Sequence, residues 1–489
     1  MTHRRVWPLA GLVVLAACAD GRSSSLEPGA LANQASGPDA VTVCHRAGNQ
    51  ASLLTVNPNA LAGLLARGDY VAHFVVDPAA PRQPGGFVFS RLTDAVLAAR
   101  STRIANGELT AGACRITIDV KPGVYTGSFD AGADTTLERF PIILDVPDIS
   151  LVGALRMLVD ADGRATGDGW PTDDMTVLVP NRPIVFDPTT EAMIVVAGHP
   201  GGSAGNGAVI EGFAFRSDRT DGTSGGAAII SLRVQGLAIR GNRFEAGLTT
   251  AADLRASSAT VDHNYATRLG LNCAFCLAGP GTYGATGNRV LNGALGGIYV
   301  SPAVQHLPFS LGANPVTDIE PYVLPTDSAA VQASLSDNEI TGHVRLPVGF
   351  AIRILALGPG TSQLRQSGAV ELSENKLTGN TFGVIVDAGF PQANTLRRGD
   401  LDVTFAENEI TGNCQVDLLV AFTRHTGALG TTSNPYLLQS NYRLTIDDAS
   451  LWQNAWYANP DQLGNALVVN GVEMAPGMHV AYDPSRGCP

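Results

Sequence analysis

The sequence predicts an all-β fold, a parallel β-helix solenoid in which short strands stack coil upon coil. Three observations predict it. An asparagine returns six times inside a fixed apolar frame, the apolar positions alternate with the period of two that strands require, and charged residues make up only 16% of the 489 residues. Sequence motifs that recur at solenoid spacing indicate stacked units that share one continuous core.

The asparagine marks a corner of each predicted coil. The positions five and three before it and two after it are apolar in every copy, as Ala333, Leu335 and Ile340 are around Asn338. Parallel stacking places equal positions about 4.8 Å apart, so the side-chain amides can pair along a ladder, which makes their burial tolerable. The ladder asparagines are Asn242, Asn264, Asn288, Asn338, Asn375 and Asn408. The 50-residue interval between Asn288 and Asn338 predicts two coils there. Asparagine-rich turns of an antiparallel β protein are the alternative.

Residues 1–18 have the features of an export signal. Arg4 and Arg5 precede a short apolar run that ends in Leu15-Ala16-Ala17-Cys18. Small residues before a cysteine resemble the lipobox of bacterial lipoproteins, which implies cleavage at Cys18 and its lipidation. The run is too short to span a membrane, and a plain secretory signal is the alternative. Residues 19–40, with several serines and prolines, are expected to form a flexible tether.

Residues 41–90 form a small Cys-His segment. It resembles a short Cys-His…Gly-Asp segment that recurs in secreted bacterial proteins without an assigned activity. Cys44, His45, Asp69 and His73 could together hold a metal ion. The alternative is that these side chains serve packing and turns.

The solenoid is expected over residues 91–450, and its entry has two recognisable parts. Thr93-Asp94-Ala95-Val96 begins an N-capped helix, and a strand from Ile116 leads into Pro122-Gly123-Val124-Tyr125. With the asparagine repeat, these segments resemble the right-handed parallel β-helix proteins of the pectin-lyase-like superfamily. The resemblance implies a right-handed coil with an N-terminal capping helix. The stretch from Glu138 to Gly153 is similar to an uncharacterised bacterial branch of that superfamily, which has no activity to transfer.

Six cysteines other than Cys18 are disulfide candidates in an exported protein. They are Cys44, Cys114, Cys273, Cys276, Cys414 and Cys488. Cys273 and Cys276 form the one close pair, and we expect it to staple a loop tip. Cys488 is expected to hold the C-terminus. The chain has neither a second close pair for a zinc ribbon nor a thioredoxin-like context for a redox motif.

The charge balance restricts the partners. A formal charge of −12 and a pI near 5.2 argue against nucleic acid and an anionic membrane surface as partners. A neutral or cation-bridged polymer is easier to accommodate, so we expect polysaccharide or another extended ligand, with the membrane contacted through the lipid anchor only. The oligomeric state stays open.

Calcium is the one cofactor that the sequence suggests. Asp337, Glu374 and Glu407 each directly precede a ladder asparagine, and stacked carboxylates repel unless a cation screens them. Oxygen ligands of this kind suit Ca²⁺. A solvated acidic stripe, softened by Lys376, is the alternative.

Catalytic residues are scattered in the sequence. A lyase needs an arginine or lysine base, and a glycoside hydrolase needs paired carboxyl groups. The candidates for these roles are Arg353, Asp387, Asp402, Asp417 and Arg424. The doublets Asp173-Asp174 and Asp447-Asp448 lack the flanking motif of a polygalacturonase-like site.

Residues 451–489 are expected to form a C-terminal cap, to which Trp452, Trp456, Tyr457 and Tyr482 contribute apolar surface. The leading interpretation is an envelope lipoprotein that binds polysaccharide or acts as a scaffold without catalysis. A polysaccharide lyase or glycoside hydrolase is the alternative, and an adhesin-like role is a third. An enzyme predicts a groove where Arg353 meets two of the acids, whereas a binder predicts a row of exposed aromatic residues.

Overall fold

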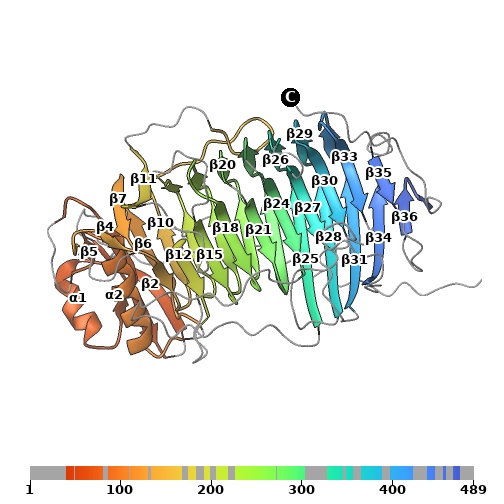
Figure 1. Ribbon diagram of the computed structural model, residues 1–489. Helices are drawn as coiled ribbons and strands as arrows, with labels where there is room; N and C mark the ends of the chain where they lie inside the picture. Colours follow the sequence, from red (N-terminus) through yellow and green to blue (C-terminus); the bar gives the residue numbers. More distant parts are fainter. Residues whose placement is uncertain are drawn as a thin grey trace, which may run out of the picture.

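The computed structural model describes residues 40–48, 50–80, 86–109, 111–129, 134–167, 174–182, 192–198, 205–217, 226–270, 272–293, 295–302, 328–344, 349–355, 365–387, 397–421, 438–446, 455–458 and 466–473. They fold as a right-handed parallel β-helix, as the sequence predicts. Figure 1 shows its strands in ranks along one long axis, with both helices at the N-terminal end. In the described part of the chain, no helix is both long and apolar enough to cross a membrane.

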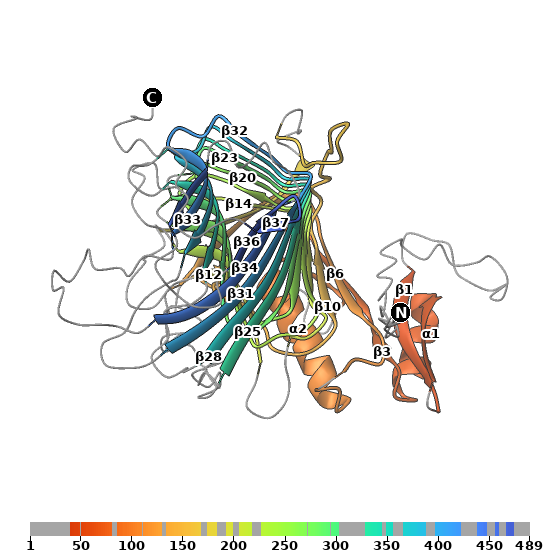
Figure 2. The same cartoon turned by 90° about the vertical axis from the view of Figure 1, so that its right-hand side faces the viewer.

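Three sheets run along the solenoid, and Figure 2 shows them enclosing the core. In spatial order, sheet I consists of β5 (Val88–Phe89), β4 (His73–Val76), β6 (Ile116–Val120), β10 (Ile149–Val152), β13 (Val209–Glu211), β16 (Leu237–Arg240), β19 (Ala259–Asp262), β22 (Gly281–Thr286), β25 (Ser328–Ser336), β28 (Arg365–Ser373), β31 (Arg397–Ala406), β34 (Leu438–Ile446), β36 (Ala466–Val469) and β37 (Val472–Glu473). Sheet II consists of β8 (Glu138–Arg139), β7 (Gly123–Ser128), β11 (Thr176–Pro180), β14 (Phe213–Phe215), β17 (Arg243–Phe244), β20 (Tyr265–Thr267), β23 (Arg289–Leu291), β26 (Glu339–Thr341), β29 (Lys376–Thr378) and β32 (Glu409–Thr411). Sheet III consists of β9 (Ile142–Leu144), β12 (Ala192–Ala197), β15 (Ala227–Leu232), β18 (Thr250–Arg255), β21 (Cys273–Ala278), β24 (Gly296–Ser301), β27 (Phe350–Leu355), β30 (Phe382–Asp387), β33 (Val416–Ala421) and β35 (Ala455–Ala458).

The asparagine ladder lies at the corner between sheets I and II, where the sequence places it. Asn288 Nδ2 donates to Asn338 Oδ1 at 2.9 Å, and Asn338 Nδ2 donates to Asn375 Oδ1 at 2.9 Å. The same Oδ1 atoms also accept the backbone N–H of the asparagine in the preceding coil, so each interior amide bonds the coils on both sides of it. The ladder is continuous from Asn242 to Asn408, and all six side chains are buried.

A second ladder, which the sequence analysis missed, lies five residues after each of the last three asparagines of the first ladder. His343, Asn380 and Asn413 stack in successive coils, and Asp417 accepts from Asn413 at its end. All four side chains are buried. The signal is present in the sequence as a Thr-Gly dipeptide before each of the first three residues.

The interval between Asn288 and Asn338 is one coil and not two. β22 pairs directly with β25, and β23 pairs directly with β26, so the two asparagines lie in neighbouring coils. The extra residues lie between β24 and β25, where a long insertion adds little loop-closure entropy.

The capping helix α2 (Leu92–Ala105) begins two residues earlier than an N-cap at Thr93 predicts. The N-cap is Arg91, which makes no side-chain capping bond. Instead the Glu138 carboxylate accepts from the backbone N–H groups of Leu92 and Thr93 at 2.7 Å each. Burial raises the pKa of Glu138, against the effect of the hydrogen bonds from Thr93 and Leu92.

The N-terminal segment divides into two parts. A small sheet of β1 (Val41–Ala47), β2 (Gln50–Val56) and β3 (Tyr70–Val71) packs with helix α1 (Pro58–Leu65), whereas β4 and β5 belong to sheet I. Figure 2 shows this small unit beside the solenoid. The Cys44–Cys114 disulfide joins the two bodies.

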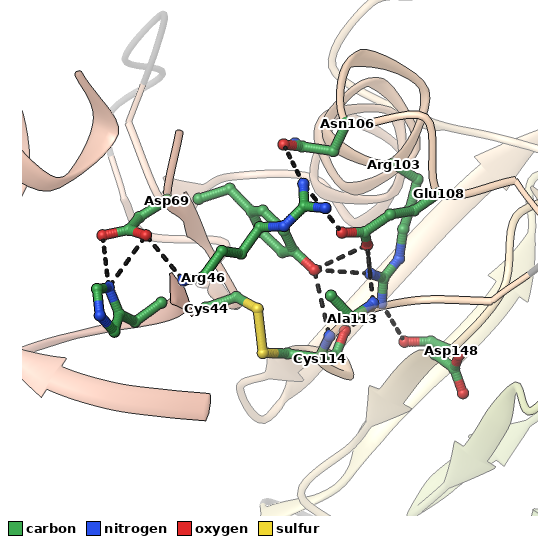
Figure 3. The surroundings of a disulfide bond; sticks show 11 residues. Cys44, Arg46, Asp69, Arg103, Asn106, Glu108, Ala113, Cys114 and Asp148 are labelled. Carbon is green, nitrogen blue, oxygen red and sulfur yellow. Dashed lines mark hydrogen bonds and ion pairs between the residues drawn. A yellow bond between two sulfur atoms is a disulfide. The ribbon is translucent and has the colours of Figure 1, made fainter. Parts of the chain in front are cut away.

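A buried polar cluster lies beside that disulfide (Figure 3). Arg103 of α2 is fully buried, and its guanidinium donates to Tyr70 Oη at 2.9 Å, to the Glu108 carboxylate and to the Pro147 carbonyl at 3.0 Å. Tyr70 Oη in turn donates to Glu108 at 2.8 Å. The charge is therefore paired, as burial requires.

Candidate functional site

An open groove of about 530 Å³ lies on the outer face of sheet I, across β22, β25, β28 and β31. Its polar lining consists of Thr282, Gln332, Ser334, Glu371, Asp402 and Thr404. The inward positions between them, including Tyr283 and Val370, are buried in the solenoid core. Strand alternation therefore separates a polar groove from an apolar interior.

In-register pairing arranges the groove residues in two rows that run along the solenoid axis. One row is Thr282, Gln332, Ala369 and Asp402, and the other is Gly284, Ser334, Glu371 and Thr404. These are the positions six and four residues before each ladder asparagine. Neighbours in a row are about 4.8 Å apart, the strand spacing.

Two exposed carboxylates, Glu371 and Asp402, stand in this groove on adjacent strands. They are in different rows, so their backbone positions differ by one strand and two residues. The strand spacing and the rise per residue place these positions about 8 Å apart. The groove therefore combines hydrogen-bonding hydroxyl and amide groups with two negative charges.

The structure divides the sequence-predicted catalytic residues that it describes between two sheets. Asp402 lies in the sheet I groove, whereas Arg353 on β27 and Asp387 on β30 occupy adjacent strands of sheet III, where Arg353 is in register with Ile385 and Asp387 with Leu355. Asp417 is buried, and its Oδ1 accepts from Asn413 Nδ2 at 2.7 Å, so it ends the second ladder. Asp387 ends β30 of sheet III, and its side chain lies outside the described residues.

Sequence reasoning missed Glu371. The frame that places the positions five and three before each asparagine in the core also turns the positions six and four before it outward. Reading those outward positions coil by coil would have placed Glu371 next to Asp402.

The calcium candidates occupy three stacked corners. Asp337, Glu374 and Glu407 have φ values of 55°, 57° and 57°, in the left-handed region. Arg164 donates to the backbone carbonyls of Asp337 at 3.1 Å and of Glu374 at 3.2 Å. Among the described residues, no group of three or more His, Cys, Asp or Glu side chains is placed to hold a metal ion.

The proposed metal ligands of the Cys-His segment are separated into different contacts. Cys44 is in a disulfide, His45 Nδ1 lies 3.0 Å from the Asp69 carboxylate, and His73 pairs with Asp119 at 2.8 Å. Burial would raise the pKa of Asp69, but hydrogen bonds from the Arg46 N–H and from His45 hold it below its usual range. Packing and turn roles account for these residues.

The disulfides differ from expectation at one point. Cys273 and Cys276 are bonded to each other, but they lie on β21 and are buried, so they do not staple a loop tip. Cys414 is also disulfide-bonded. Several residues that the sequence analysis named lie outside the described part of the chain, namely Cys18, Asp173, Arg424, Asp447, Asp448, Trp452, Tyr482 and Cys488. Of Trp456 and Tyr457 the structure describes only the strand, β35.

Comparisons with known proteins give structural neighbours alone. No family model and no curated protein matches the chain. The lidless DFA-IIIase from Arthrobacter chlorophenolicus aligns at 10% identity and a TM-score of 0.37, over 82% of this chain and 94% of that one. The catalytic domain of a GH87 α-1,3-glucanase in complex with tetrasaccharides aligns at 11% identity and 0.36, over 86% and 71%. A tailspike protein from an Escherichia coli bacteriophage aligns at 10% and 0.26, over 88% and 49%. At identities of 10 to 11% and TM-scores of 0.26 to 0.37, these similarities carry no argument about activity.

Proposed function

We propose that the sheet I groove binds an extended polysaccharide without cleaving it. One observation carries the proposal: polar side chains occupy six of the eight positions in the two in-register rows, with Ala369 and Gly284 at the other two, so each of the four strands presents a hydrogen-bonding group to the groove. A polymer of sugar rings also repeats its hydroxyl groups along one direction. The rows and the polymer can therefore make the same contacts several times over.

The chemistry of the lining supports the choice of ligand. Thr282, Ser334 and Thr404 offer hydroxyl groups that donate and accept, and Gln332 offers both halves of an amide. The aromatic residue of the lining, Tyr283, is buried, so ring stacking on it is unavailable. We expect affinity to come from many hydrogen bonds along the chain.

Blocking the groove tests this function. Ser334 is exposed in the middle of the groove, so Ser334→Trp fills it without disturbing the core. Thr260→Trp is the matched control, because Thr260 is exposed in the same register row on β19, outside the groove. With starch, pullulan and hydroxyethylcellulose as probes in affinity electrophoresis, retardation should be lost in Ser334→Trp and kept in Thr260→Trp. Equal retardation of both variants would refute the groove as the binding site.

One observation favours a second function, glycoside hydrolysis. The backbone positions of Glu371 and Asp402 are about 8 Å apart, so these exposed side chains can bring their carboxyl groups to the separation of about 6.5 to 9.5 Å that leaves room for an attacking water. Such a site would use one residue as general acid and the other as general base. New reducing ends produced by the wild-type chain, and absent with Glu371→Gln or Asp402→Asn, would establish hydrolysis and overturn binding without cleavage.

We also propose that the chain is exported and lipid-anchored in the cell envelope through Cys18. The signal-like residues before Cys18 support this location, and so do the paired cysteines, since disulfides persist in oxidising compartments. Labelled palmitate should enter the wild-type chain on expression in bacteria but not Cys18→Ser. Labelling of the serine variant would contradict the assignment.

A further inference from the structure

The charges of the groove point to the class of polysaccharide that it takes, an inference that rests on the proposed binding function. Both charged residues that line it, Glu371 and Asp402, are acidic, and none of its described lining residues is basic. Within the groove, their neighbours in the two rows are the uncharged residues Ala369, Ser334 and Thr404. A ligand that crosses β28 and β31 therefore passes both carboxylates.

The nearest basic residue in register lies at the border of the groove. Arg443 on β34 is the register partner of Asp402, and it is exposed. Glu371 has no basic register partner, because its register partners are Ser334 and Thr404. The negative charge in the middle of the groove is therefore not balanced by a basic residue in register.

We propose that the groove selects polysaccharides without anionic groups, whose hydroxyl or ammonium groups donate to Glu371 and Asp402, and rejects polymers that carry carboxylates. A carboxylate acceptor bonds strongly to a hydroxyl or ammonium donor. A second carboxylate at the same position has no proton to share and repels the first. The rejection is local to the groove, beyond the repulsion that arises from the net charge of the chain.

Matched polymers test the selection. Starch, pullulan and hydroxyethylcellulose are each compared with the same polymer after oxidation of primary hydroxyls to carboxylates, in the presence of a chelator. We expect the oxidised form to bind the wild-type chain at least about tenfold more weakly, with the difference shrinking as salt is added. In Glu371→Gln/Asp402→Asn, which keeps shape and removes charge, the two forms should bind within about threefold of each other.

The outcomes separate this inference from the function on which it rests. If no polymer binds, or if binding survives in Ser334→Trp, the proposed function itself fails. If a polymer binds in the groove and its oxidised form binds equally well or more tightly, the function stands and the selection is wrong. Binding of the oxidised form that requires added Ca²⁺ would also overturn the selection, because the carboxylates would then hold a bridging cation.

Discussion

His343 differs from the asparagines at the equivalent positions of the second ladder because its side chain can titrate. It occupies the position that Asn380 and Asn413 occupy in the next coils, and its Nδ1 donates a hydrogen bond to Asn380 Oδ1 at 3.1 Å. Its Nε2 is buried without a hydrogen-bond partner, close to Gly293. Burial lowers the pKa of His343 from 6.5 to about 4, against the effect of the Asn380 hydrogen bond.

This shift predicts a pH-dependent stability. Because the folded pKa is below the unfolded one, the unfolded chain binds more protons between the two values, so stability is full above pH 6.5 and falls as the pH drops toward 4. Between pH 7 and pH 5, His343 should remove about 2 kcal/mol from the free energy of unfolding. His343→Asn continues the ladder without a titrating group, so urea unfolding of this variant should lack that loss. His263→Asn, at a partly exposed corner, is the control. An unchanged pH dependence in His343→Asn would refute the assignment.

Asp417 is a structural residue at the end of the second ladder. Its Oδ1 accepts from both the backbone N–H and the side-chain amide of Asn413. Asp417→Ala leaves these buried donors unpaired and should lower the free energy of unfolding by about 2 kcal/mol. Asp417→Asn keeps the acceptor and should cost less than half of that. Neither variant should change polysaccharide retardation. A large loss of binding in folded Asp417→Asn would place Asp417 in the ligand site instead.

The corner between sheets I and II is the element that fixes the stacking of the coils. Each interior ladder asparagine donates to the carbonyl of a neighbouring coil as well as to the next amide, as Asn338 does to Ala285 at 2.9 Å. The positions before the asparagine adopt left-handed φ values, for example 55° at Asp337. The amide bonds hold the corner in this sharp turn in every coil.

A substitution in the middle of the ladder should therefore lower the stability of the folded protein. Asn338→Ala removes bonds to Asn288, to Asn375 and to Ala285, and it leaves buried partners unpaired. We expect a loss of about 3 kcal/mol in chemical denaturation. Asn59→Ala on the exposed face of α1 is the matched asparagine control and should change stability by less than about 0.5 kcal/mol. Equal effects of the two substitutions would contradict a stabilising ladder.

At the scale of the whole molecule, two bodies are joined side by side. The solenoid buries one continuous core along its sheets, whereas the unit of β1, β2, β3 and α1 has a small cluster of its own around Val43 and Leu64. The Cys44–Cys114 disulfide and the Arg103 cluster connect them (Figure 3). The small unit depends on this junction more than the solenoid does.

Opening the disulfide tests that dependence. The cysteines are 70 residues apart, and a cross-link over such a loop stabilises by about 4 kcal/mol in the chain-entropy treatment. Cys44→Ser/Cys114→Ser should make residues 41–71 the first site of limited proteolysis, while groove binding persists. The Cys273–Cys276 disulfide closes no long loop, so Cys273→Ser/Cys276→Ser should not produce cleavage in residues 41–71. Protection of residues 41–71 in the first variant would show that the Arg103 cluster alone suffices.

The repeat motif alone specifies each coil. Residues around Asn338 and Asn375 specify strand, corner and core face within a few positions, and the similar motifs stack because each coil buries the apolar surface of its neighbour. The folded structure fixes which coil lies against which. It reduced the interval from Asn288 to Asn338 to one coil, and it brought Glu138 to the start of α2. These non-local contacts leave no periodic signal in the chain, whereas the outward positions of the repeat already place Glu371 beside Asp402.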